Sequence, residues 1–131
     1  MAVVEDSYNR FIHLIFYLDD GRMLAFSDLR KFGKMVLGTV QQIENLPELT
    51  NLGPEPLDPS FKFITFLKLI KAEGRKIKQV LLDPNVVAGI GNIYSDDILW
   101  TAKIHPFKPS SRLNNLELKK LWLAMKKVLT K

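Results

Sequence analysis

The sequence predicts an α+β fold, in which a short antiparallel β-hairpin is followed by an all-helical domain. Near the N-terminus, two apolar runs rich in aromatic and β-branched residues flank an Asp-Gly pair, a pattern typical of a hairpin. From Ser60 onward, apolar residues recur at helical spacing with lysines between them. The chain has 131 residues, of which 47% are hydrophobic and 25% charged, so it can bury a core.

The predicted hairpin joins strands at Phe11–Leu18 and Arg22–Phe26 through the turn that contains Gly21. A third strand is expected from about Lys34 to Val40. These strands are apolar on both faces, and the chain offers few further strand candidates. We therefore expect the N-terminal part to be a remnant of a larger β structure.

Between the second and third predicted strands lies a polar connection, residues 27–33, with the sequence SDLRKFG. Its residues alone predict a surface loop in which Arg30 and Lys31 are solvated and Phe32 folds back onto the core. The following residues, 41–58, contain three prolines and a glycine, which predicts a linker rather than an element.

The helical part is expected to begin at Asp58-Pro59, with the carboxylate as cap and proline at the first position of a helix over Ser60–Ala72. Gly74 ends this helix, and Arg75–Leu82 forms the next one. A last helix is predicted from Asn114, because Glu117 follows at capping-box spacing. We expect its inward side to contain Leu116, Leu121, Ala124, Met125, Val128 and Leu129, with Lys119, Lys120, Lys126 and Lys127 exposed.

A glycine turn precedes the central helix. Gly89 and Gly91 allow a tight turn and close approach by another molecule, and Asn92 is predicted to be the N-cap. Free N–H groups at such a helix start favour an anion, and in a basic chain the expected anion is a nucleic-acid phosphate. Asp96 and Asp97 are expected early in this helix, where negative charge suits the dipole. The predicted buried side consists of Ile93, Ile98, Leu99 and Trp100.

His105-Pro106 is expected to close the central helix, with His105 as a structural cap rather than a base. The net charge of +5 favours an anionic partner. The absence of cysteine excludes disulfides and a cysteine zinc site, and two histidines make any metal site unexpected. No apolar run approaches the length of a membrane span, and the first residues lack a signal peptide's apolar centre, so we expect a soluble, intracellular protein without a membrane partner.

Three stretches resemble, in order, the formamidopyrimidine-DNA glycosylase and endonuclease VIII family, which excises oxidised bases. They are DGRMLAFSDLRKFG at residues 20–33, LGPEPLDPSF at 52–61 and IKQVLLDPNVVAGIGNIYSDDILWTAKIHP at 77–106. The third looks like the family's helix-two-turn-helix segment, and the likeness is strongest to formamidopyrimidine-DNA glycosylase. It implies last strands of a β-sandwich with an intercalating hairpin over residues 1–40, a linker over 41–59 and a helix-two-turn-helix DNA-binding domain over 60–131.

The resemblance also implies a set of DNA-binding residues. Arg30 would contact the base opposite the lesion and Phe32 would wedge into the stack, offsetting part of the cost of flipping a base. Lys78 would lie near the DNA, and Asn92 would bond a backbone phosphate. The full set of expected DNA-binding residues is Arg30, Phe32, Arg75, Lys78, Gly91 and Asn92. The expected partner is double-stranded DNA with an oxidised base or an abasic site, in a bacterial cytoplasm near the nucleoid.

The sequence departs from the family where the chemistry lies. The family uses an N-terminal proline amine with a neighbouring glutamate, whereas this chain begins MAVVED, so no catalytic residue is assigned. Removal of Met1 would expose Ala2 as an amine that could in principle form a Schiff base. The family's single structural zinc sits in a C-terminal finger that this chain lacks. We expect a DNA-binding core fragment, with base-excision-repair glycosylase and AP lyase chemistry in a monomeric, full-length parent; the sequence leaves the fragment's own oligomeric state open.

Two alternatives remain at this point. Helix-two-turn-helix segments also occur in a small-subunit ribosomal protein and a type II topoisomerase, so the glycine turn alone is compatible with a non-catalytic RNA-binding module. The RKFG loop and the LGPEPL linker argue for the glycosylase family. The other alternative is an inert helical scaffold, which would bind nothing even at low salt.

Overall fold

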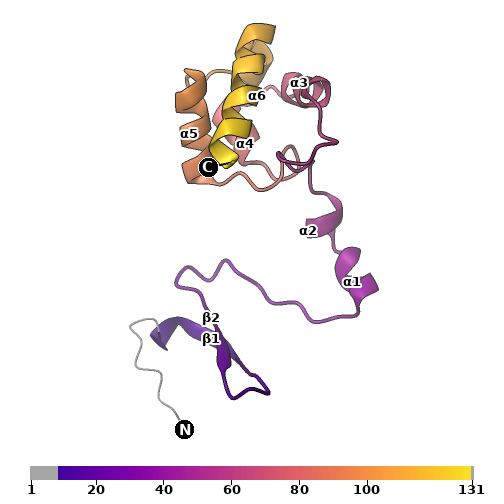
Figure 1. Ribbon diagram of the computed structural model, residues 1–131, viewed down its shortest axis with the longest axis vertical. Coiled ribbons are helices and arrows are strands. Elements are labelled where there is room, and N and C mark those ends of the chain that lie inside the picture. Colours follow the sequence, from indigo (N-terminus) through magenta and orange to yellow (C-terminus); the bar gives the residue numbers. More distant parts are fainter. Residues whose placement is uncertain (1–8, 131) are drawn as a thin grey trace. The chain divides into compact units, whose positions relative to one another are not determined.

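The computed structural model describes residues 9–130, with the side chain of Asn9 excepted. Its contacts divide the chain into two compact units between Ile43 and Glu44. The first unit contains the hairpin and the second contains the long helices (Figure 1). This architecture confirms the predicted α+β class.

The hairpin forms as predicted. A 3₁₀ turn at Asn9–Phe11 leads into β1 (Ile12–Tyr17), which pairs antiparallel with β2 (Met23–Ser27). The register pairs Tyr17 with Met23 and shifts by a bulge between Ile12 and Leu14. Gly21 turns the chain at φ 82°, a left-handed conformation that suits glycine.

The expected third strand is wrong. Residues 33–39 form no strand, and within residues 9–130 the sheet has only β1 and β2. The sequence signal that decides against a strand is a helix cap. The Thr39 N–H donates to the Gln42 side chain at 2.9 Å, and the Gln42 N–H donates to the Thr39 hydroxyl at 3.3 Å. This reciprocal cap starts α1 (Val40–Glu44) where the strand was expected to end.

The expectation of a linker without elements is also wrong. The proline-rich stretch contains the end of α1 and the single-turn α2 (Pro47–Thr50), with Pro47 at the first helical position. Neither helix contains a buried residue. Both are therefore local turns of the chain rather than parts of a core.

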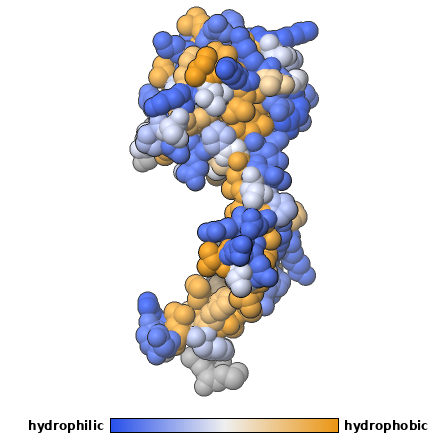
Figure 2. All heavy atoms as spheres, turned by 90° about the vertical axis from the view of Figure 1, so that its right-hand side faces the viewer, coloured by the Kyte–Doolittle hydropathy of each residue, from blue (hydrophilic) through white to orange (hydrophobic). Residues whose placement is uncertain are grey.

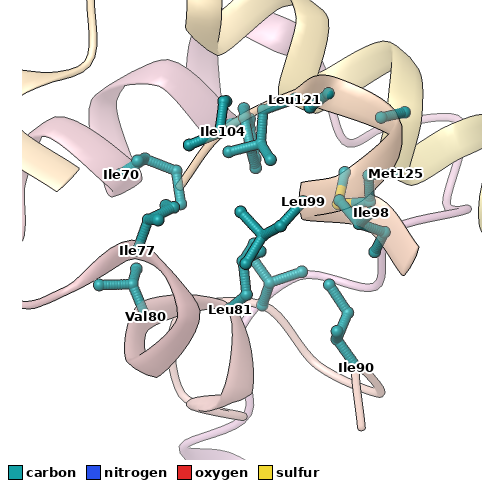
Figure 3. Close-up of a cluster of buried hydrophobic side chains, with 14 of the residues drawn as sticks. Ile70, Ile77, Val80, Leu81, Ile90, Ile98, Leu99, Ile104, Leu121 and Met125 are labelled. Atoms are coloured by element: carbon teal, nitrogen blue, oxygen red, sulfur yellow. The ribbon is translucent and has the colours of Figure 1, made fainter. Parts of the chain in front are cut away.

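The second unit consists of α3 (Phe63–Ala72), α4 (Ile77–Leu82), α5 (Asn92–Ala102), the 3₁₀ turn η2 (Ser110–Arg112) and α6 (Asn115–Leu129). Helices α5 and α6 pack along each other (Figure 1). Side chains from all four helices and from the α4–α5 turn converge in one apolar core (Figure 3). Its fully buried members include Phe66, Ile70, Ile77, Val80, Leu81, Ile98, Leu118, Leu121 and Met125.

Helix α3 begins three residues later than predicted. The Asp58 carboxylate accepts the Ser60 N–H at 2.7 Å and so closes a turn rather than capping the helix. That turn directs Phe61 into the core, where it is 5% exposed and packs edge-on against Trp122 at 5.2 Å between ring centroids. Helix α4 likewise begins at Ile77 instead of Arg75, because Lys76 pairs with Pro109 in an isolated bridge.

The capping box of α6 is confirmed. Asn114 accepts the Glu117 N–H at 2.9 Å, and Glu117 accepts the Asn114 N–H at 3.0 Å. Two side-chain placements were wrong: Leu116 is exposed, and Lys126 is half-buried rather than free. Lys126 donates to the Pro56 carbonyl and lies over the Trp122 ring at 4.5 Å, so its aliphatic stem covers apolar surface.

None of the helices within residues 9–130 combines the length and the apolarity that crossing a bilayer requires.

Candidate nucleic-acid interface

Backbone hydrogen bonds join the turn between α4 and α5 to the LGPEPL segment, residues 52–57. The Gly53 N–H donates to the Pro84 carbonyl at 2.8 Å, and the Ala88 N–H donates to the Pro54 carbonyl at 3.1 Å. A Cβ at Gly53 would lie 2.6 Å from the backbone carbon and oxygen of Val86. Only glycine allows this approach, so the segment fixes the turn that precedes α5.

Within the turn, Gly89 has φ 79° and Ile90 is buried. Gly91, rather than Asn92, is the N-cap of α5, and no side chain caps the helix there. The predicted N-cap role of Asn92 is wrong because the helix begins one residue earlier than expected. Asn92 is the first helical residue and is exposed. No side chain caps the first N–H groups of α5, which is the arrangement that favours an anion.

The buried stripe of α5 differs from the prediction. It consists of Ser95, Ile98, Leu99 and Ala102, which follow helical spacing. Ile93 is 78% exposed and Trp100 is 86% exposed, so both apolar residues lie off that stripe. Ser95 can be buried because its hydroxyl donates to the Asn92 carbonyl at 2.8 Å. The prediction ranked residues by hydrophobicity where spacing was decisive.

Lys78 comes from α4 and lies beside α5. Its Nζ is 2.7 Å from Asp96 Oδ1, and its side chain retains 28% exposure. Its backbone N–H donates to the Pro106 carbonyl at 3.2 Å, which fixes the start of α4. Asp96 and Asp97 both lie in the second turn of α5 rather than the first. Asp96 therefore interacts more directly with the Lys78 ammonium than with the helix dipole.

Arg75 is bound between two carboxylates. Its Nε lies 2.7 Å from Glu73 Oε2 and its guanidinium NH1 lies 2.8 Å from Asp83 Oδ2. The hydrogen bonds that the Arg75 guanidinium donates to Glu73 and to Asp83 raise its pKa above the ordinary value. Asp83 is the C-cap residue of α4, so Arg75 lies toward that end of the helix. Its direct contact with a nucleic acid stays a prediction.

On the hairpin unit, the loop after β2 presents its large side chains outward. Phe32 is 84% exposed, and Arg30 and Lys31 are also exposed. The expectation drawn from the residues alone, that Phe32 folds back onto a core, is wrong. The hairpin offers Phe32 no packing partner, since β1 itself is largely exposed. Arg30 and Phe32 thus lie on the first unit, while Lys78, Gly91 and Asn92 lie on the second.

His105 has a structural role, although not the predicted one. Helix α5 already ends at Ala102, and Lys103 takes a left-handed φ of 58°. His105 Nδ1 accepts the Phe107 N–H at 3.2 Å and so caps the turn that follows.

The described residues do not fit a zinc site. Within residues 9–130, no three His, Asp or Glu side chains gather where they could hold a metal ion, and the sequence contains no cysteine. The α-amine considered at Ala2 lies outside the described residues.

The sequence model for the formamidopyrimidine-DNA glycosylase H2TH domain matches residues 52–131. The chain belongs to the formamidopyrimidine-DNA glycosylase family. The match includes α3 to α6 and the LGPEPL segment that holds the turn. The suspected resemblance is thereby confirmed.

Relatives within the family extend the match to the hairpin unit. The formamidopyrimidine-DNA glycosylase of Moorella thermoacetica is 46% identical over 117 residues, which cover 89% of this chain and 43% of the relative. That of Streptococcus thermophilus is 42% identical over 113 residues, covering 86% of this chain and 41% of the relative. The chain thus spans less than half the length of these glycosylases.

Solved structures of the family share the fold. Lactococcus lactis Fpg in complex with DNA containing an abasic site superposes with a TM-score of 0.84 at 33% identity, covering 98% of this chain and 47% of that one. The MutM (Fpg) protein from Thermus thermophilus gives a TM-score of 0.73 at 38% identity, covering 85% of this chain and 42% of that one. Family membership and fold therefore agree.

Sequence reasoning missed two residues that organise the candidate interface. Gly53 was treated as part of a linker, and Asp28 was not singled out at all. Asp28 could have been found from the sequence, because an aspartate at the start of a short loop that ends in glycine typically accepts backbone N–H groups of that loop. Gly53 had none, since its close neighbour Val86 lies far along the chain.

Proposed function

We propose that this chain is the DNA-binding core of a base-excision-repair formamidopyrimidine-DNA glycosylase. Its partner is double-stranded DNA that contains an oxidised base or an abasic site. The observation that carries the proposal is the start of α5 in a basic chain, where Gly91 leaves the first N–H groups without a side-chain cap. One turn further along the helix, Asp96 pairs with Lys78. Solved relatives bound to DNA with an abasic site or with carbocyclic 8-oxo-G support this partner.

In this proposal the two units contact DNA differently. The N–H groups at the start of α5 and the amide of Asn92 bind a backbone phosphate, and Lys78 adds positive charge next to it. Arg30 and Phe32 enter the base stack, where an aromatic wedge and a guanidinium offset part of the cost of an unpaired site. Arg75 is also proposed to contact DNA, because Glu73 and Asp83 accept only from its Nε and Nη1, which leaves further guanidinium N–H groups for a phosphate.

The full-length parent, in this proposal, hydrolyses the N-glycosyl bond of oxidised purines and cleaves at abasic sites through a Schiff base. No described residue of this chain is assigned to that chemistry, and no described residue is assigned to zinc. The parent is a monomer of the bacterial cytoplasm, associated with the nucleoid.

The proposed domain organisation follows the family. Residues 1–40 correspond to the last strands of a β-sandwich with the intercalating hairpin, 41–59 to a connecting segment and 60–131 to the helix-two-turn-helix domain. The exposed apolar strands support this assignment: Leu14 and Phe16 share one face of β1 and Ile15 lies on the other, yet all three are exposed. Figure 2 shows hydrophobic surface on the unit that holds the hairpin. Strands of this kind belong in the interior of a larger sheet structure.

The alternatives are less favoured. An RNA-binding module of the ribosomal kind would explain the glycine turn, but it would not explain the RKFG loop and the LGPEPL segment in the same chain. An inert scaffold does not explain why Phe32 is exposed and why the start of α5 has no side-chain cap.

The test uses Asn92→Asp, with Asn115→Asp as the matched control. Both residues stand first in their helices, where a new carboxylate suits the dipole and should not weaken the fold. At the proposed phosphate site, however, the new charge repels DNA. By fluorescence anisotropy on an abasic duplex, we expect about tenfold weaker binding for Asn92→Asp and a salt slope lower by about 1.

Asn115→Asp should bind like the wild type, because its side chain bonds Lys71 on α3 and stands at another helix start. Equal binding by both variants would remove α5 from the interface. Tighter binding of the wild type to ribosomal RNA than to the abasic duplex would favour the RNA-binding alternative. No binding at low salt would favour the inert scaffold.

A further inference from the structure

The loop over Asp28–Gly33, here termed the wedge loop, is anchored to β1 through the backbone of its first residue. The Asp28 N–H donates to the Phe11 carbonyl at 3.0 Å. The Asp28 carbonyl lies 3.0 Å from His13 Nε2, within hydrogen-bond distance. Both backbone groups of Asp28 are therefore held, one by Phe11 just before β1 and the other by His13 within it. The backbone from which the Asp28 side chain extends is thus fixed in place.

The Asp28 carboxylate holds the rest of the loop. Its Oδ1 accepts the Arg30 N–H at 2.9 Å, and its Oδ2 accepts the Gly33 N–H at 2.7 Å. The Gly33 bond is the main reason why the pKa of the Asp28 carboxyl lies below its ordinary value, and the N–H groups of Arg30, Lys31 and Phe32 add to it. One carboxylate thus accepts N–H groups from both the first half and the end of the loop.

Two backbone features make this closure possible. Lys31 has a left-handed φ of 57°, which turns the chain back toward Asp28. A Cβ at Gly33 would lie 2.7 Å from Phe26 Cζ and 3.1 Å from Asp28 Oδ2. Any larger residue at position 33 would therefore have to displace the Phe26 ring and crowd the Asp28 carboxylate.

The side chains that the loop presents are not held by packing. Phe32 is 84% exposed and Arg30 is exposed. Their direction depends on the backbone of the wedge loop, and that backbone depends on Asp28.

We propose that Asp28 is a positioning residue, which holds the wedge loop so that Arg30 and Phe32 are already arranged to enter DNA at an unpaired site. This role rests on the proposed function and adds to it a determinant of preference for abasic over intact duplex. A loop that is already ordered in the free protein loses little further conformational entropy when it binds DNA. Without the carboxylate, the loop must be ordered by the DNA, and the preference falls.

The test compares Asp28→Ala with Asp20→Ala in the 131-residue chain. Asp20 is the matched control, because it stands at the other end of the same hairpin and also accepts a backbone N–H two residues on, from Arg22 at 3.0 Å. Both substitutions remove one carboxylate, so they change the net charge equally. Affinity is measured for an abasic duplex and for an intact duplex of the same sequence, with 2-aminopurine opposite the abasic site to report unstacking.

We expect Asp28→Ala to lower the preference for abasic DNA about tenfold and to abolish the 2-aminopurine signal, while affinity for intact duplex changes less than about twofold. Asp28→Asn, which keeps an acceptor oxygen, should recover part of both. Asp20→Ala should behave as the wild type. A purely structural role would lower affinity for both duplexes together.

The outcomes separate this proposal from the function on which it rests. If the wild-type chain binds neither duplex, the proposed function fails. If it binds intact and abasic duplex equally, or if Asp28→Ala keeps the preference or loses both affinities alike, only the role of Asp28 is overturned.

Discussion

Single side chains hold together segments that lie far apart in this sequence. Ser110 is fully buried, and its hydroxyl donates to the Glu73 carbonyl at 2.6 Å, while its N–H donates to the Arg75 carbonyl at 3.0 Å. These bonds join η2 to the end of α3. Nothing in the local sequence marks Ser110 above its neighbour Ser111, because the partner carbonyls come from another part of the chain.

Ser110→Ala should lower the free energy of unfolding by about 1–3 kcal/mol, because the part-buried Glu73 carbonyl loses its donor. Ser111→Ala is the control, since Ser111 is exposed and the same atom is removed. Urea denaturation followed by circular dichroism measures both variants. Equal stability of the two would show that the hydroxyl of Ser110 contributes nothing.

The stability of the wedge loop at low pH follows from the lowered pKa of Asp28. Hydrogen bonds from Gly33 and its neighbours hold the pKa of Asp28 below its ordinary value of 3.8. The ionised form is thus favoured in the folded loop, whose closure is complete above pH 3.8 and is lost as the pH falls through the lowered pKa.

In a pH titration by NMR, the Asp28 carboxyl carbon should therefore have a midpoint below 3.8. The Gly33 amide proton should move with the same midpoint, because it donates to that carboxylate. A midpoint at the ordinary value, or a Gly33 amide that does not follow it, would contradict the described loop.

At the scale of elements, the sequence correctly predicted those elements that are formed by contacts between residues close together in the chain. The hairpin around Gly21 and the capping box of α6 are both formed within a few residues, and both predictions are confirmed. The third strand failed because strand pairing needs a partner, whereas the Thr39–Gln42 cap needs only its own four residues. The start of α3 failed because Phe61 packs on Trp122, which sequence spacing does not reveal.

The capping box offers a test at this scale. Asn114→Ala removes the acceptor for the Glu117 N–H and should cost about 1 kcal/mol of stability, whereas Asn114→Ser should keep most of it. Thermal unfolding of the two variants beside the wild type gives the comparison. Because α6 supplies much of the core, unchanged stability of Asn114→Ala would mean that packing, and not the cap, sets the start of this helix.

At the scale of the whole molecule, the candidate interface was predictable in part. The glycine turn, Lys78 and Asn92 were found from the sequence, and the structure places Lys78 against α5. The neutralisation of Arg75 by Glu73 and Asp83 was not predictable, because the ion pairs depend on where α4 ends. The outward position of Ile93 and Trp100 depends on which stripe of α5 meets α6, and that is a property of packing.

The most direct measurement is an NMR titration of the isotope-labelled chain with an abasic duplex, following backbone amides. The largest shifts are expected at Gly91, Asn92 and Ile93, at the start of α5, and at Arg30 and Phe32 in the wedge loop. Smaller changes are expected at Lys68 and Lys71, the exposed lysines of α3. Shifts confined to α3, or spread evenly over the basic surface, would contradict the claim that the uncapped start of α5 binds the phosphate.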